Sequence, residues 1–182
     1  KYKQIDSVEI KKINLNIIEI VLIDRKPTAT VCDGYRDEEQ DNICYFVDKN
    51  GYVYELSPKF SDGVYTRYYI NSDEKKIEIG STFIGKETFS KLQNFISNIN
   101  RQGIITLGIL IGDSNSYELY IRNKDQSTAV VYFDDRTPLD ITLSNLTTFW
   151  ENANNNKIGT TTNPIFNYIN LRFGNNVFYS LK

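Results

Sequence analysis

YFVDKNGYVYE, residues 45–55, places two alternating runs of large and polar side chains on either side of Asn50-Gly51. Alternation with a period of two is typical of a β-strand, because successive side chains point to opposite faces of a sheet. Asn-Gly is the strongest short-range signal for a hairpin, and it favours a type I′ turn in which both central residues have positive φ. The stretch therefore predicts a β-hairpin with strands over 43–48 and 52–56.

Upstream of this hairpin, the same alternation predicts an antiparallel pair of strands. The runs DSVEIKK (6–12) and LNIIEIVLID (15–24) alternate aliphatic with charged or polar side chains, and a short link joins them. Pro27 then makes an interior strand position unfavourable, because proline cannot donate to a ladder. We expect a domain boundary there, followed by a strand over TATVC (28–32) and an acidic, solvated loop over 33–42.

The two cysteines, Cys32 and Cys44, end one predicted strand and begin the next. An even cysteine count suits a disulfide in a compartment outside the cytoplasm. A cross-strand approach of these residues is geometrically possible, and two buried thiols are the alternative.

Downstream of the hairpin, the pattern predicts two helices among several strands. VYTRYYI (64–70) and KKIEIG (75–80) read as strands or extended segments. A helix is expected over 85–102, because its apolar residues recur at helical spacing and Gly103 follows. Three consecutive strands follow, over IITLGILIG, SYELYIRN and TAVVYFD.

The second helix is expected to start at Thr137 as N-cap with Pro138 in its first turn. Its predicted buried stripe is Leu139, Leu143, Leu146 and Trp150. The chain then closes with FNYINLRF and NVFYSLK, which flank Gly174-Asn175 and predict a terminal hairpin. Runs of strands interrupted by only two helices indicate an α+β fold with a mostly antiparallel sheet.

Composition excludes several classes of function. The chain has 182 residues and a net charge of -2, which gives no electrostatic footprint for nucleic acid. It contains no histidine, which removes Ser-His-Asp and Cys-His catalysis and the common zinc sites. No stretch is long and apolar enough for a transmembrane helix.

No catalytic motif in the sequence is complete. GSTFIGKET (80–88) is close to a P-loop, but Glu87 stands in place of the Ser or Thr, and no βαβ context is evident. Asp134-Asp135 and the acidic run 37–41 have the character of turn and surface residues. We therefore expect no enzyme activity, no metal and no cofactor.

Four short motifs, in order along the chain, resemble the FtsQ/DivIB family of bacterial cell-division proteins. They are IDSV (5–8), IDRKPTA (23–29), YFVDKNGYVY (45–54) and INLR (169–172). The chain departs from the family pattern at Asp24, where the family usually has Glu, and at Asn170, where it usually has Asp. The resemblance implies the C-terminal part of a POTRA domain over 1–26 and a β domain over 27–182.

The resemblance also implies a function. It implies a non-enzymatic scaffold of the divisome, held by a single membrane helix upstream of this chain, with this domain on the extracytoplasmic side of the cell membrane. FtsB/DivIC-like and FtsL-like proteins would be the partners. Within this frame the aromatic residues of 45–55 are core residues rather than a ligand site, and Asp48 and Gly51 shape the turn.

The partner site implied by the resemblance is the C-terminal β edge, to which the partner would add a strand. It comprises Arg172, Phe173, Val177, Phe178, Tyr179 and Ser180. Arg172 offers a planar fork of donors suited to a partner carboxylate. The alternatives are an arginine bonded within its own sheet and an edge already covered by its own chain.

Two other classes of function compete with this reading. Another POTRA-bearing module of envelope assembly or secretion would share the architecture. An enzyme acting on wall polymers or nucleotides would need a deep pocket with converging carboxylates, or nucleotide binding through Lys86.

Overall fold

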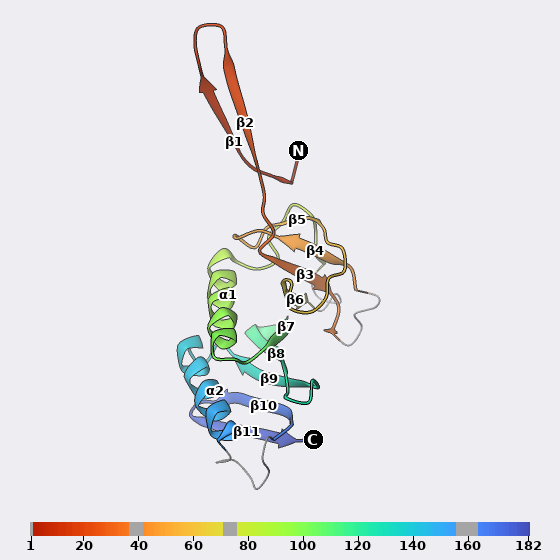
Figure 1. Cartoon of the computed structure of the whole chain (residues 1–182), viewed down its shortest axis with the longest axis vertical. Helices are drawn as coiled ribbons and strands as arrows, with labels where there is room; N and C mark the ends of the chain where they lie inside the picture. Colours follow the sequence, from red (N-terminus) through yellow and green to blue (C-terminus); the bar gives the residue numbers. More distant parts are fainter. Residues whose placement is uncertain (1, 37–41, 71–75, 156–163) are drawn as a thin grey trace.

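The computed structural model describes residues 2–36, 42–70, 76–155 and 164–182 of the chain (Figure 1). Within these ranges, two α-helices and eleven strands form an α+β fold, as the sequence predicts. In chain order the elements are β1 (Ile5–Lys12), β2 (Ile18–Asp24), β3 (Ala29–Asp33), β4 (Cys44–Val47), β5 (Val53–Leu56), β6 (Thr66–Ile70), α1 (Lys86–Arg101), β7 (Thr106–Ile111), β8 (Ser116–Arg122), β9 (Thr128–Asp134), α2 (Leu139–Asn154), β10 (Phe166–Phe173) and β11 (Asn176–Leu181).

The first two strands form a sheet of their own. β1 and β2 pair antiparallel, which confirms the predicted pair, and they project away from the rest of the molecule (Figure 1). One face of this hairpin carries aliphatic side chains that are each more than half exposed: Val8, Ile10, Ile18, Ile20 and Leu22.

The other nine strands form one mixed sheet in the order β11-β10-β9-β8-β7-β6-β3-β4-β5. Most neighbours run antiparallel, and β9–β10, β6–β7 and β3–β6 run parallel. Two of these parallel pairs are joined through a helix, β6 to β7 through α1 and β9 to β10 through α2. A crossover helix is the usual connection between parallel neighbours, and both helices lie on the same face of the sheet (Figure 1).

The main core lies between this sheet and the two helices. The inward face of α1 supplies Phe89, Leu92, Phe95, Ile96 and Ile99, and these pack with the alternate residues of the central strands. The spacing of the α1 residues matches the sequence prediction. Helix α1 ends before Gly103, whose φ of 79° suits a residue without a Cβ.

The predicted hairpin over 45–55 is confirmed, but its expected type I′ turn is wrong. Gly51 has a φ of 76°, whereas Asn50 is not among the described residues with positive φ. The amide of Gly51 donates to the carbonyl of Asp48 (3.0 Å), and the amide of Asp48 donates to the carbonyl of Tyr52 (3.1 Å). The connection is therefore a three-residue loop with glycine in the left-handed position.

The predicted N-cap of the second helix is also wrong. Helix α2 begins at Leu139, and Pro138 occupies the N-cap position with a ψ of 141°. No side chain caps the helix, so Thr137 does not perform the expected role. The Thr142 hydroxyl instead donates to the carbonyl of Pro138 (3.2 Å).

The buried stripe of α2 differs from the predicted one. Its buried residues are Thr142, Leu146, Phe149 and Ala153. Leu139, Leu143 and Trp150 are only partly buried and lie at the margin of the core. The Phe149 ring contacts the Phe166 ring of β10, with centroids 5.3 Å apart, and the Trp150 ring contacts the same ring at 5.9 Å.

Two predicted segments fall partly outside the described residues. The acidic loop over 33–42 is described only at its ends, and KKIEIG is described from residue 76. Over 76–80 no strand forms, and the segment leads into a turn at Gly80.

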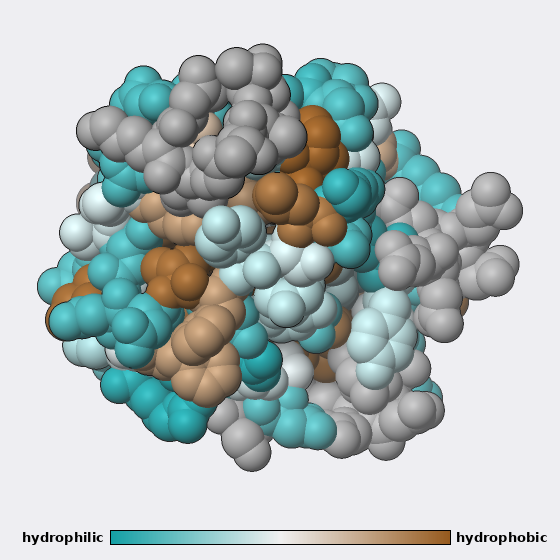
Figure 2. Space-filling model, turned by 90° about the horizontal axis from the view of Figure 1, so that it is seen from below, coloured by the Kyte–Doolittle hydropathy of each residue, from teal (hydrophilic) through white to brown (hydrophobic). Residues whose placement is uncertain are grey.

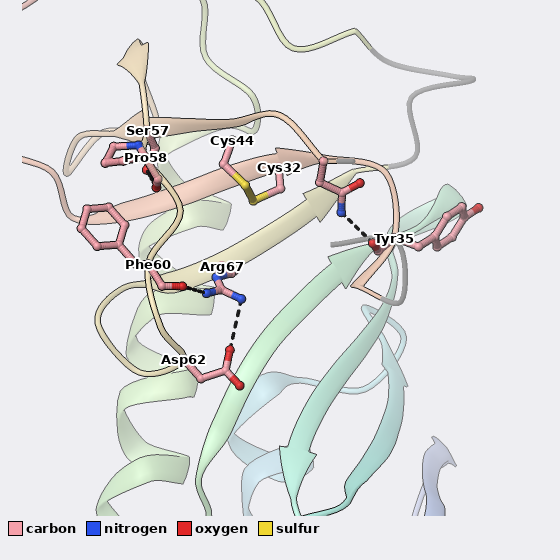
Figure 3. The surroundings of a disulfide bond; sticks show 9 residues. Cys32, Tyr35, Cys44, Ser57, Pro58, Phe60, Asp62 and Arg67 are labelled. Atoms are coloured by element: carbon pink, nitrogen blue, oxygen red, sulfur yellow. Dashed lines mark hydrogen bonds and ion pairs between the residues drawn. A yellow bond between two sulfur atoms is a disulfide. The ribbon is translucent and has the colours of Figure 1, made fainter. Parts of the chain in front are cut away.

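On the face of the sheet opposite the helices, Cys32 and Cys44 form a disulfide between the neighbouring strands β3 and β4 (Figure 3). A second, smaller core surrounds it, made of Cys32, Tyr69, Leu107, Leu110 and Tyr120. The loop after β5 covers part of this face, and Arg67 holds it by donating to the carbonyl of Phe60 and pairing with Asp62 at 3.1 Å (Figure 3).

Candidate functional site: the C-terminal sheet edge

Strand β11 is the last strand of the nine-stranded sheet, and it pairs on one side only. Its antiparallel partner is β10, and no strand of the described residues lies on its other side. A two-residue loop, Gly174-Asn175, sets this hairpin, and Gly174 has the positive φ (63°) that such a loop requires. The Asn145 side chain of α2 donates to the carbonyl of Gly174 (3.0 Å), which ties the loop to the helix layer.

At the opposite edge of the sheet, another segment of the chain covers part of β5. On β5, Val53 donates to the carbonyl of Ser81 (2.9 Å) and accepts from the amide of Gly80 (2.7 Å). A further bridge joins Tyr52 and Thr82. The segment around 80–83 therefore covers the start of β5, whereas no described segment covers β11.

The composition of β11 leaves this edge open to pairing. Soluble proteins usually blunt an exposed edge strand with charged residues, proline or a bulge. The six residues of β11, NVFYSL, include neither a charged residue nor a proline. The β10–β11 pairing has two register shifts, but each places the extra residue on β10, so β11 itself is continuous. Figure 2 looks onto this end of the molecule and shows hydrophobic residues interspersed with hydrophilic ones.

A hydrogen bond just after the C-terminal end of β11 shows which way each backbone group of the strand points. The amide of Lys182 donates to the carbonyl of Ile165 (2.9 Å), so residue 182 faces the chain that leads into β10. Backbone groups alternate along a strand, so those of Phe178 and Ser180 also face β10. The N–H and C=O groups of Val177, Tyr179 and Leu181 therefore point to the open side.

The side chains of β11 divide between the two faces of the sheet. On the helix side, the ring of Tyr179 contacts the rings of Phe149 (5.3 Å) and Phe166 (6.0 Å), and Val177 packs against the main core. Phe178 lies 54% exposed, and its ring contacts the equally exposed Phe173 (5.0 Å). Ser180 is partly buried and donates to the carbonyl of Leu181 (3.3 Å).

Arg172 lies on β10 and is held within its own sheet. Its Nε and its backbone amide both donate to the Asn170 side chain (3.1 and 3.2 Å). Its guanidinium lies 5.2 Å from the centroid of the Tyr132 ring on β9. This arrangement matches the alternative of an arginine bonded in its own sheet, and it leaves the terminal nitrogens without a hydrogen bond to any described residue.

A groove with mixed charge adjoins Arg172 and Phe173 at the end of the hairpin. Its other lining residues are Asp113, Ser116, Asp134, Asp135 and Arg136. Arg136 hydrogen-bonds the Asp134 carboxylate (2.9 Å from Nε) and holds the pKa of that carboxyl below its usual range. Asp135 accepts from Asn115 (2.7 Å). These acids serve local hydrogen bonds, as turn residues do.

The structure thus brings all six predicted site residues onto one hairpin. It also shows two contacts that the sequence analysis does not predict: the Tyr132 ring lies against Arg172, and the Phe149 ring lies against Tyr179. The first could not be identified from local pattern, because the pairing of β9 with β10 depends on the α2 crossover. The second is visible in the sequence as an aromatic one position before Trp150.

Several amides of the segment that resembles a P-loop form hydrogen bonds within the fold. Gly80 donates to Val53 and Phe83 donates to the carbonyl of Gly51 (3.2 Å), whereas a P-loop directs its amides at phosphate. Within the described ranges, no group of three cysteine or acidic side chains is arranged to hold a metal ion. Neither described helix is long and apolar enough to cross a membrane.

Comparison with known protein families and with curated proteins finds no match to this chain.

Proposed function

We propose that this chain is the extracytoplasmic part of a bacterial cell-division scaffold of the FtsQ/DivIB type. Its role is binding rather than catalysis, and it needs no cofactor. An FtsB/DivIC-like partner, together with an FtsL-like protein, adds a strand to β11. The observation that carries the proposal is the open edge of β11, which carries no charged residue or proline and has no strand on its outer side among the described residues.

Strand addition fits the chemistry of this edge. The outward backbone groups of Val177, Tyr179 and Leu181 would supply the ladder hydrogen bonds, which give affinity without sequence preference. The side chains of Phe178 and Tyr179 lie on opposite faces and would contact alternate residues of the partner strand. Arg172, with its terminal nitrogens available, would add a bond to a partner carboxylate and so contribute specificity.

The disulfide supports the proposed location. Disulfides form and persist in oxidising compartments and are rare in the cytosol. The Cys32–Cys44 bond therefore favours an extracytoplasmic domain, which a single membrane helix upstream of this chain would anchor.

The proposal is tested by titrating the ¹⁵N-labelled chain with the C-terminal peptide of the FtsB/DivIC-like protein from the same genome. We expect amide shifts concentrated in 168–181. Tyr179→Pro should abolish binding, whereas Tyr179→Ala should retain it in weakened form, because both variants lose the ring and only proline loses the outward N–H.

Arg172 has its own matched pair in the same titration. Arg172→Glu should weaken binding by about tenfold or more, the scale of a charge-assisted bond, and Arg172→Gln by less. Absence of binding at high peptide concentration, or shifts confined to other strands, would contradict the proposal. Shifts centred on the β1–β2 hairpin would favour another POTRA-bearing envelope module instead.

A further inference from the structure

Only two residues connect the β1–β2 hairpin to the rest of the protein. The amide of Arg25 still donates to the carbonyl of Gln4 within the hairpin (2.7 Å). The amide of Thr28 already donates to the carbonyl of Val47 in the large sheet (2.8 Å). Lys26 and Pro27 lie between them, and among the described residues no strand pairing joins the two sheets.

The side chain of Arg25 spans this junction. Its Nη1 pairs with the Asp48 carboxylate on the turn of the β4–β5 hairpin and donates to Asp6 of β1 (3.0 Å). Its guanidinium also lies 4.2 Å from the centroid of the Tyr52 ring. The side chains of Arg25 and Asp48 are only 15% and 4% exposed, so solvent screens this pair less than a surface pair.

Asp48 is a fixed partner. Its Oδ1 accepts hydrogen bonds from the amides of Asn50 (2.8 Å) and Tyr52 (3.1 Å), while its other oxygen faces Arg25. The turn itself therefore holds the carboxylate in the orientation that faces Arg25. Arg25 is fixed from the other side, because its Nε donates to the carbonyl of Lys3 (3.0 Å).

Two further polar contacts cross the junction, and one of them is largely exposed to solvent. Lys49 lies 3.8 Å from Asp6, and its side chain is 73% exposed. Lys3 donates to the carbonyl of Ile79 at the margin of the large sheet. The aliphatic side chains of the hairpin, such as Ile10 and Ile20, are 70% and 62% exposed, so they bury little surface against the large sheet.

We propose that Arg25 is a latch that locks the Lys26–Pro27 hinge and fixes the direction of the hairpin on the large sheet. With Arg25 seated on Asp48, Asp6 and Tyr52, the chain is one rigid body. Without it, the hairpin and the large sheet become two bodies joined by a two-residue connector. The direction of the hairpin on the large sheet is thus set chiefly by the contacts of Arg25, while Lys3 and Lys49 add contacts at the margin.

The test is a measurement of amide residual dipolar couplings on the whole ¹⁵N-labelled chain in a weakly aligning medium. In the wild type, one alignment tensor should fit both the hairpin and the large sheet. In Arg25→Gln and in Asp48→Asn, the magnitude of the alignment tensor fitted to the hairpin should fall at least about twofold relative to that of the large sheet. Such a fall is expected of a unit that moves independently. Lys49→Gln is the matched control and should keep the wild-type tensor.

The Asp48→Asn variant distinguishes loss of the latch from loosening of the hairpin itself. Arg25→Gln removes a bond within the hairpin and can loosen it, whereas Asp48→Asn leaves every hydrogen bond of the hairpin in place. Cross-strand contacts between Val8 and Leu22 report whether the hairpin stays folded. The proposal would be overturned if the wild type needs two alignment tensors, or if one tensor fits both units in the Asp48→Asn variant.

Discussion

At the scale of single residues, the buried hydroxyl of Tyr68 on β6 has a cost in stability that can be measured. The side chain is fully buried, and its ring contacts those of Phe83 and Phe89, each with centroids 5.4 Å apart. The hydroxyl finds no hydrogen-bond partner among the described residues, and burial raises its pKa above the ordinary value. An unpaired buried hydroxyl costs free energy, which the aromatic packing must offset.

Tyr68→Phe should therefore raise the free energy of unfolding by about 1 kcal/mol, because it removes the unpaired hydroxyl and keeps the ring. Urea unfolding measures the change. Tyr120→Phe is the matched control, because that hydroxyl donates to Glu118 (3.2 Å) and its loss should lower stability by about 1 kcal/mol. Equal destabilisation in both variants would contradict this account of Tyr68.

Single positions are also where prediction from sequence was weakest. The Asn50-Gly51 signal located the hairpin but gave the wrong turn, because Asp48 accepts from two loop amides and closes a three-residue loop. Likewise, no local sequence pattern predicts the role of Arg25. Its partners Asp48 and Tyr52 are 23 or more positions away and meet it only through the fold.

At the scale of elements, the disulfide joins β3 to β4 and closes the acidic loop between them. Cys32 and Cys44 are paired residues of neighbouring antiparallel strands, 12 positions apart. Such a cross-link restricts the unfolded chain, and for a loop of this length the chain-entropy estimate is about 3 kcal/mol.

The double variant Cys32→Ala/Cys44→Ala should lower the free energy of unfolding by about 3 kcal/mol, again measured in urea. Wild-type protein reduced in denaturant and refolded under reducing conditions should show the same loss. A change below about 1 kcal/mol would mean that the loop is already ordered in the unfolded chain.

The elements were largely predictable because local signals specify them. Both helices and the three-strand meander β7–β9 follow directly from hydrophobic periodicity and turn residues. The three parallel pairings were not predicted, although β6-α1-β7 and β9-α2-β10 each have the order strand, helix, strand. Pairing order depends on long-range packing, which periodicity does not encode.

At the scale of the whole molecule, the two features with proposed roles lie at opposite ends. The β1–β2 hairpin with its Arg25 latch lies at one end, and β11 lies at the other (Figure 1). In the proposed scaffold, the upstream anchor would approach through the hairpin and the partner would bind at the far edge. A rigid latch would then hold the binding edge at a fixed distance and direction from the membrane.

The central claim is that a partner adds a strand to β11, and amide hydrogen exchange with and without the partner peptide tests it most directly. In the free protein, the outward amides of Val177 and Tyr179 should exchange fast, and those of Phe178 and Ser180, which face β10, should be protected. Peptide binding should slow exchange at Val177 and Tyr179 by at least about tenfold. Saturable binding without slower exchange at these two amides would contradict strand addition.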